Sequence, residues 1–255
     1  MHAQWRSALW WTLGIVVLAL VTVSFWPSVE GTDALSSLEK SMSPELLEAF
    51  GAQNLSTPAG HLDGQLYALL LPLLFSGLAI GNASAITSGD EDAGRLELLL
   101  PISRQALWAW RYVSVLLVLA AVTLVTTAVV VSTLGVFSLE EAGAGRVVAA
   151  TVACGLLGAF HGALAFAVGG LGGSRGMALG VAILVLLGGY VVNFLFPLSD
   201  ALAGLRRLSP WYWGIGEQPV TNGVSWSWLV LLVAVTAIIV AVGTVGVCRR
   251  DIRPP

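Results

Sequence analysis

The charges of this chain are arranged so that six long stretches carry none. Each of these runs is at least 23 residues long and consists mainly of apolar side chains. A helix needs about 20 residues to cross the hydrocarbon core of a bilayer, and in lipid the polar backbone groups must bond within the segment. The sequence therefore predicts an all-α integral membrane protein with six transmembrane helices. The uncharged runs are 7–29, 64–89, 112–139, 147–174, 176–199 and 218–248.

Composition supports the same class, because 56% of the residues are hydrophobic and only 11% are charged, against roughly 25% charged in a soluble domain. The first run could also be a signal peptide, with Arg6 preceding it. However, its apolar stretch is too long, and residues 25–27 (Phe-Trp-Pro) are not a small-residue cleavage site. We therefore expect a retained first helix. The two cysteines, Cys154 and Cys248, indicate no disulfide framework.

We expect a single membrane domain over residues 1–255. A loop at 27–64 follows the first span, and its part 33–50 has the apolar spacing of a helix that lies on the membrane surface. Pro72 should kink the second span. An aromatic segment at 205–214 is too long for a tight turn, and we expect it to re-enter the membrane or rest on the outer leaflet. The predicted spans are 7–26, 65–86, 106–137, 147–171, 177–198 and 226–248.

Basic residues in the loops predict the orientation. Six spans place both termini on one side, together with the connection between the second and third spans. This side carries eight arginines, whereas the other side carries four basic residues. Because Lys and Arg concentrate in cytoplasmic loops, we expect a multi-pass protein of the cell (inner) membrane with both termini in the cytoplasm. The four residues on the outer side are Lys40, Arg146, Arg206 and Arg207.

A charged island at 88–104 joins the second and third spans. Ser88 and Glu91 have the spacing of a capping box, and the three acids at 90–92 suit a helix N-terminus. Pro101 would end this short helix. The pattern fits a helix that docks on a partner, and it fits equally an interfacial hairpin whose leucines enter lipid. The leucines that share one face are Leu96, Leu99 and Leu100.

The island resembles the coupling-helix region of type-2 ABC (ABC-2) exporter permeases. Two departures are visible: Arg95 replaces the small hydroxyl residue usual there, and the chain is one residue shorter before Pro101. Further local similarity at 208–212, 219–223 and 248–252 extends the resemblance over the whole chain. The residues that match are Glu91 (or Asp90), Gly94, Leu96, Glu97, Leu98, Leu99, Leu100, Pro101, Ser103, Arg104 and Arg111.

This resemblance implies a permease subunit of an ATP-driven exporter. It would work with a second permease copy, as a homodimer or with a related permease, and with a P-loop ATP-binding-cassette ATPase that binds ATP and Mg. The chain itself would be neither an enzyme nor a cofactor carrier. Its residues agree, because a P-loop needs Gly-Lys-Ser/Thr and Lys40, the only lysine, follows Glu39. The residues implied in coupling to the ATPase are Asp90, Glu91, Asp92, Gly94, Arg95, Leu96, Glu97, Leu98, Leu99, Leu100, Pro101, Ser103, Arg104 and Arg111.

The resemblance also places the translocation path between the second and fifth spans, and the apolar walls suggest a lipophilic or amphiphilic cargo such as a drug, lipid or peptide antibiotic. We expect His161, in the fourth span, to be a neutral histidine bonded to a neighbouring helix, since no acid or base lies in the interior of any other span. Small-residue pairs such as Gly158-x-x-x-Gly162 favour close packing within the chain. The candidate path residues, for which helix packing is the alternative role, are Phe75, Asn82, Tyr190, Asn193 and Phe194.

Two other functions stay open at this point. An ion-coupled secondary transporter would need a charged side chain near mid-membrane, and the predicted spans contain none. A membrane scaffold or sensor could share the fold without transporting anything. We expect no metal site, because His2, His61 and His161 lie at different membrane depths. Membrane lipids are expected contacts, and nucleic acid is not.

Overall fold

The computed structural model describes residues 2–30, 37, 40–43, 46–47, 54–89 and 104–249. Within this part of the chain, six helices are long and apolar enough to cross a membrane. Their number is the number of spans predicted, and the largest difference in position is that the second helix begins at Pro58, whereas the predicted span began at Gln65. The helices cover Ala8–Val29, Pro58–Ile86, Gln105–Thr133, Ala144–Gly170, Arg175–Leu198 and Trp226–Arg249.

The first span consists of α1 (His2–Ser24) and α2 (Trp26–Val29). The second consists of α5 (Pro58–Leu62), a π-helical turn η1 (Asp63–Tyr67) and α6 (Leu70–Ile86). The third and fourth are α8 (Arg104–Thr133) and α9 (Ala144–Gly170), with the 3-10 turn η3 (Glu140–Ala142) between them. The remaining elements are α10 (Arg175–Phe194), the 3-10 turns η4 (Phe196–Leu198) and η5 (Ala203–Leu208), α11 (Pro210–Ile215) and α12 (Trp226–Arg249).

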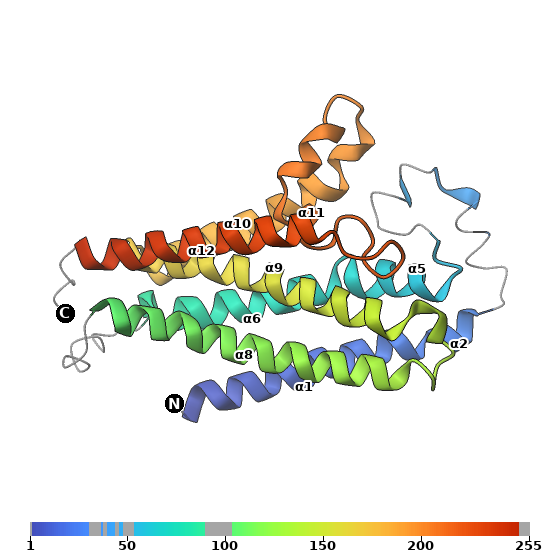
Figure 1. Ribbon diagram of the computed structural model, residues 1–255, viewed down its shortest axis with the longest axis horizontal. Helices are drawn as coiled ribbons and strands as arrows, with labels where there is room; N and C mark the ends of the chain where they lie inside the picture. Colours follow the sequence, from blue (N-terminus) through green and yellow to red (C-terminus); the bar gives the residue numbers. More distant parts are fainter. Residues whose placement is uncertain are drawn as a thin grey trace.

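Helix α9 is the centre of the bundle. It contacts α6, α8, α10 and α12, and Figure 1 shows it running between these helices. In the most apolar part of this span 72% of the residues are buried inside the protein, whereas only 17% are buried in the first and the last span. The peripheral helices thus direct apolar side chains outward, as helices in contact with lipid do.

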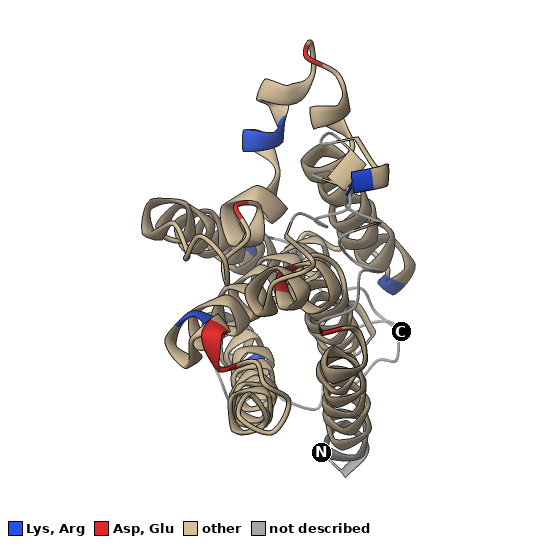
Figure 2. Cartoon of the chain, turned by 90° about the vertical axis from the view of Figure 1, so that its right-hand side faces the viewer, with Lys and Arg blue, Asp and Glu red and all other residues tan. Residues whose placement is uncertain are grey.

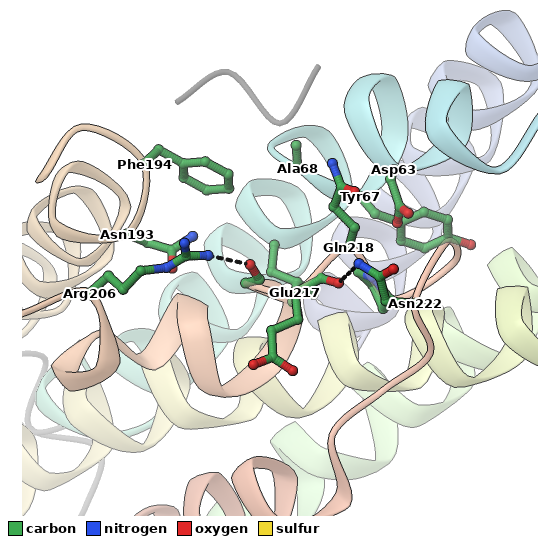
Figure 3. Close-up of a pocket in the computed structure, with 12 residues that line it drawn as sticks. Asp63, Tyr67, Ala68, Asn193, Phe194, Arg206, Glu217, Gln218 and Asn222 are labelled. Atoms are coloured by element: carbon green, nitrogen blue, oxygen red, sulfur yellow. Dashed lines mark hydrogen bonds between the residues drawn. The ribbon is translucent and has the colours of Figure 1, made fainter. Parts of the chain in front are cut away.

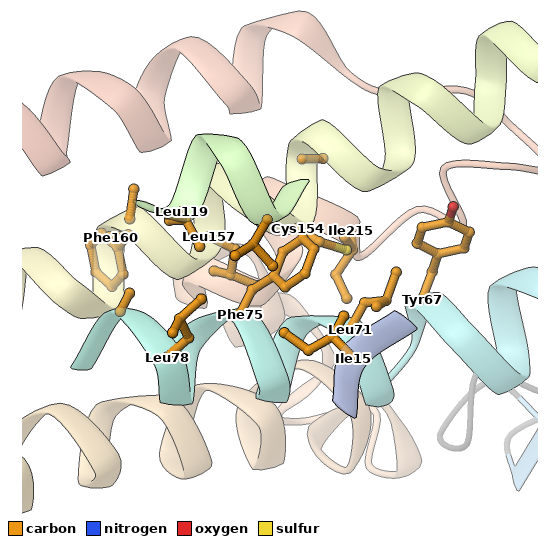
Figure 4. Close-up of a cluster of buried hydrophobic side chains, with 14 of the residues drawn as sticks. Ile15, Tyr67, Leu71, Phe75, Leu78, Leu119, Cys154, Leu157, Phe160 and Ile215 are labelled. Carbon is orange, nitrogen blue, oxygen red and sulfur yellow. The ribbon is translucent and has the colours of Figure 1, made fainter. Parts of the chain in front are cut away.

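Glycines let α6 and α9 approach closely. A Cβ on Gly158 would lie 3.0 Å from the backbone carbon of Phe75, and a Cβ on Gly162 would lie 3.0 Å from the Cβ of Ala79. The predicted role of this glycine pair in packing within the chain is therefore confirmed. Figure 4 shows the contact, where Phe75 of α6 lies against Leu157 of α9.

Polar side chains between these two helices bond to one another. His161 Nδ1 lies 3.0 Å from Ser76 Oγ of α6 and 2.9 Å from the carbonyl oxygen of Leu157. The prediction that His161 bonds to a neighbouring helix is confirmed. Tyr67 and Thr151 form a second pair across the same interface, with their hydroxyl oxygens 2.8 Å apart.

The bundle has two distinct ends. The start of α1 and the end of α12 lie at one end, which we call the terminal end, and α2 and α5 lie at the opposite, far end (Figure 1). Figure 2 views the far end, where charged residues lie largely on connecting segments and short helices. The predicted surface helix at 33–50 falls mostly outside the described residues. The aromatic segment at 205–214 forms the end of η5 and most of α11, which contacts α9, α10 and α12.

Candidate functional site

A cavity of about 350 Å³ opens at the far end of the bundle (Figure 3). Its walls come from three parts of the chain: the first turns of the second span, the last turn of α10, and the segment 206–222, which begins within η5 and ends before α12. Polar and apolar side chains both contribute to the lining, which consists of Asp63, Tyr67, Ala68, Asn193, Phe194, Arg206, Ile215, Gly216, Glu217, Gln218, Pro219 and Asn222.

The second span is irregular where it borders this cavity. Pro72 has no N–H, so it cannot donate the helical hydrogen bond to the carbonyl of Ala68. Leu69 accordingly leaves the helical conformation (φ −141°), and the turn before it widens into the π-turn η1, where the N–H of Ala68 bonds to the carbonyl of Asp63 at 2.6 Å. The irregular backbone thus lies in the turns before Pro72, whereas the kink was predicted at Pro72 itself.

Asp63 fastens the segment 206–222 to the second span. Its side chain is 2% exposed, and its two oxygens accept backbone N–H groups, Oδ1 from Val220 at 3.0 Å and Oδ2 from Thr221 at 2.8 Å. Arg146, at the start of α9, donates to the carbonyls of the same two residues at 3.4 and 3.0 Å. An acid from one span and a base from another thus hold the same short stretch of backbone.

Arg206 and Tyr212 organise the opposite wall. The guanidinium of Arg206 lies 5.0 Å from the centre of the Tyr212 ring and donates to the carbonyl of Gly216 at 2.8 Å. Tyr212 donates its hydroxyl hydrogen to Glu217 Oε1 at 2.6 Å. Burial disfavours the phenolate and raises the pKa of Tyr212 above its ordinary value, and the bond to Glu217 raises it further. The phenol therefore remains a hydrogen-bond donor at neutral pH.

Helix α11 is anchored on α10 by two polar contacts. Ser209 donates to the carbonyl of Gly189 at 2.7 Å, and the indole of Trp211 donates to the carbonyl of Leu186 at 2.8 Å. Gly189 is required at this crossing, because a Cβ there would lie 2.9 Å from the Trp211 ring. These contacts hold α11 on the C-terminal half of α10, and the last turn of that helix places Asn193 in the cavity wall.

The five candidate path residues separate into two groups. Asn193 and Phe194 line the cavity, and the Tyr190 ring lies 4.8 Å from that of Phe194. Phe75 is buried against α9 instead, and Asn82 donates to the carbonyl of Leu78 in its own helix at 2.9 Å. The structure thus brings three of these residues together at the far end and places the other two deeper in the α6 helix.

Sequence reasoning selected none of the charged residues of this cavity. Asp63 directly precedes the second uncharged run, so the predicted span began after it. A usable signal was present, because Leu62 and Leu66 continue the apolar spacing of the span back through Asp63. No comparable signal connects Arg146 to Val220 and Thr221, since these partners are distant from it in sequence.

A second, larger cavity of about 580 Å³ lies between α8, α9 and α12. Its lining is mainly apolar, and its hydroxyl groups are already bonded: Tyr112 donates to the carbonyl of Ala159, and Thr236 and Thr244 donate to their own helix. This groove offers space for hydrocarbon but few polar groups to orient a ligand, so we assign it no specific site.

The residues of the charged island, 90–103, lie outside the described part of the chain, and for Arg104 only the backbone is described. The segments that flank the island are well packed. Ser88 is buried, and a Cβ on Gly169 of α9 would lie 2.6 Å from Thr87 Oγ1 and 2.9 Å from Ser88 Oγ. Arg111, on the other flank, is buried with its guanidinium 5.6 Å from the centre of the Trp108 ring.

Comparison with known protein families yields a match over nearly the whole chain. A sequence model of a family described as "ABC-2 family transporter protein" matches residues 2–252. No curated protein is similar enough to the chain to be matched.

Proposed function

The chain belongs to the ABC-2 transporter family, and from this premise we propose that it is the permease subunit of an ATP-driven exporter. Membrane proteins of this family are transport components and not themselves enzymes. A separate P-loop ATPase subunit would therefore bind ATP and Mg and hydrolyse the nucleotide. The observation that carries the proposal is the extent of the family match, which includes every membrane-spanning helix described above.

In this proposal the charged island is the element that docks on the ATPase. Its flanks support such a role, because both are fastened to the central helix. Thr87 and Ser88 lie against Gly169 of α9. On the α8 side, Trp108 and Tyr112 pack on the ring of Phe166, with ring centres 5.8 and 5.1 Å away. A movement of the island would therefore reach α9 through two rigid contacts.

We further propose that the termini and the island face the cytoplasm and that the far end faces outward in the cell membrane. The charge distribution supports this orientation, since eight of the twelve basic residues lie on the side of the termini. The far-end cavity would then open toward the outside, where an exported molecule leaves the protein.

A second permease copy, most simply an identical chain, would complete the transport path. Only 22% of the residues in the apolar window of the fifth span are buried. This helix borders both the far-end cavity and the exposed surface, so a partner placed there would enclose a path between α6 and α10. The cargo would be lipophilic or amphiphilic, such as a drug, lipid or peptide antibiotic. The exposed apolar side chains of α10 include Met177, Val181, Ile183, Leu184, Leu187 and Val191.

Purification from the native membrane tests the proposal. A tagged chain extracted in mild detergent should bring down a P-loop ATPase at about one to one, identified by mass spectrometry. A preparation that contains no ATPase would contradict the exporter role and leave a secondary transporter or a scaffold. Transport in proteoliposomes separates the exporter from a secondary transporter: ATP-dependent export should survive collapse of the ion gradients, whereas ion-coupled transport should stop. A scaffold should show no transport in either case.

A further inference from the structure

Asn193 presents an unbonded amide to the far-end cavity. Its side chain is 2% exposed, and neither Oδ1 nor Nδ2 has a hydrogen-bond partner among the described residues. Buried amides are nearly always bonded, because burial removes the water that would otherwise satisfy them. Oδ1 lies close to Gly216 in the cavity wall, where a Cβ on the glycine would be 3.0 Å away. The amide therefore has one acceptor and two donor hydrogens available.

The charged groups around the cavity already have partners. Both oxygens of Asp63 accept backbone N–H groups, and Glu217 accepts the hydroxyl hydrogen of Tyr212. The guanidinium of Arg206 is bonded to a carbonyl and stacked on a ring. Since each of these charged groups already has a partner within the protein, the cavity is suited to a neutral ligand rather than to an ion.

The remaining walls are partly apolar, beside the amide side chains of Gln218 and Asn222. Phe194, Ile215 and Pro219 contribute hydrocarbon surface. Tyr67 adds its ring, because its hydroxyl is bonded to Thr151 in the interface with α9. Figure 3 shows Phe194 and Asn193 on the same side of the cavity. A ligand that fits these walls would combine an apolar part with one compact polar group.

We propose that the far-end cavity binds a small, neutral amphiphile that carries an amide group. The N–H of the ligand donates to Asn193 Oδ1 and its carbonyl accepts from Nδ2, while its apolar part lies against Phe194 and Ile215. The volume of about 350 Å³ is at the lower end of the range of about 300–1,000 Å³ for sites that hold drug-sized ligands. This inference rests on the proposed function only in one respect, namely that the far end faces the outside of the cell. If both hold, the expected cargo is narrowed from lipophilic or amphiphilic molecules to neutral amides.

Binding can be measured on the full chain in lipid nanodiscs, without an ATPase. The probe is N-acetyl-leucinamide, which is neutral and has amide groups and an apolar side chain. The matched compound is free leucine, which has the same side chain but carries both charges. Saturation-transfer NMR should show saturable binding of the amide and binding of leucine that is at least about tenfold weaker.

Substitutions at Asn193 locate the binding. Asn193→Leu has a similar shape but no donor or acceptor, and should weaken binding of the amide about tenfold or more, since two hydrogen bonds are lost. Asn193→Ser keeps a hydroxyl and should retain part of the affinity. Thr127→Val removes a hydroxyl that bonds within α8 to the carbonyl of Thr123 and should leave binding unchanged.

Three results would overturn the inference: no saturable binding to the unmodified chain, equal affinity for leucine, or unchanged binding in Asn193→Leu. Thermal unfolding checks whether Asn193→Leu folds. If Asn193→Leu does not fold, Asn193→Ser decides instead, and full affinity of that variant for the amide would overturn the inference. Because the ATPase is absent, failure here leaves the exporter role intact. Failure to recover an ATPase from the native membrane likewise leaves this binding result standing.

Discussion

At the scale of single residues, Asp63 is the residue on which the far end depends most. A buried carboxylate is costly unless its charge is compensated. Here two backbone N–H groups bond to it, and Arg146 binds the carbonyls of the same two peptide units. The carboxylate and the segment therefore stabilise each other, and neither is satisfied without the other.

Asp63→Ala should destabilise the protein by about 2–4 kcal/mol, because two charge-assisted hydrogen bonds are lost and their donors are left in a buried site. Thermal unfolding in nanodiscs would show a lowered midpoint, and limited proteolysis would show faster cleavage between residues 216 and 225. Asp200→Ala, at an exposed carboxylate, is the matched control and should change neither. Equal behaviour of the two variants would contradict the fastening role of Asp63.

Residue identity alone could not reveal which polar groups are satisfied. The sequence identified Asn193 and His161 as polar residues within spans, and it predicted the bond of His161 to another helix, here with Ser76. That Asn193 has no partner among the described residues depends on how 206–222 folds over it. Such a property arises from contacts between segments that are far apart in the chain, so no local pattern carries it.

At the scale of elements, α9 organises the bundle because its small residues admit other helices. Gly158 and Gly162 face α6, and Gly243 of α12 lies against α9 so closely that a Cβ there would be 2.7 Å from the Cα of Ala167. In lipid, where helices gain little from hydrophobic association, such close backbone contact is a principal source of stability.

Gly158→Ala should therefore destabilise the protein by about 1–3 kcal/mol, since the added methyl group meets backbone atoms of Phe75 that cannot move without shifting α6. Gly180→Ala is the matched substitution, as no atom lies within 4 Å of a Cβ at that position, and it should cause no loss. The comparison requires only the unfolding midpoints of the two variants. A similar loss in both would mean that helix–helix contact is not the cause.

The elements show how far the sequence predicts this fold. The lengths of the uncharged runs were enough to predict the six spans, because a helix that crosses lipid needs about 20 predominantly apolar residues. The break in the second span was only partly predictable. Pro72 indicated a kink, but proline removes a bond to residue 68, so the irregular turns precede it. The inclusion of Asp63 in the span was not predictable, because its carboxylate bonds to the N–H groups of residues 220 and 221, which are distant in sequence.

At the scale of the whole molecule, the two ends of the bundle are connected through α9. The flanks of the island contact it at the terminal end, and Arg146 and Tyr67 join it to the cavity at the far end. In the proposed exporter, a push from the ATPase on the island would thus be transmitted by one rigid helix to the site where cargo leaves.

Replacement of Glu97 or Arg104 by alanine should uncouple substrate-stimulated ATP hydrolysis without loss of folding, because both residues belong to the island that is proposed to dock on the ATPase. The measurement is ATPase activity of the reconstituted complex with and without substrate. Arg207→Ala and Glu141→Ala, at exposed charges of the far end, serve as controls that should keep full stimulation. Full coupling in both island variants would refute the docking role.

The π-turn at Asp63–Tyr67 also bears on how this span tolerates changes in length. A π-turn accommodates one residue more than an α-turn, so the second span contains a surplus residue at this point. Deletion of one residue there would restore regular α-helical winding without the rotation of about 100° that a deletion in a regular α-helix causes. Asp63 would then still face residues 220 and 221, and the apolar part of the span that follows would keep its register. A deletion in the regular helix α6 would instead rotate the parts of the span on either side of it by about 100° relative to each other.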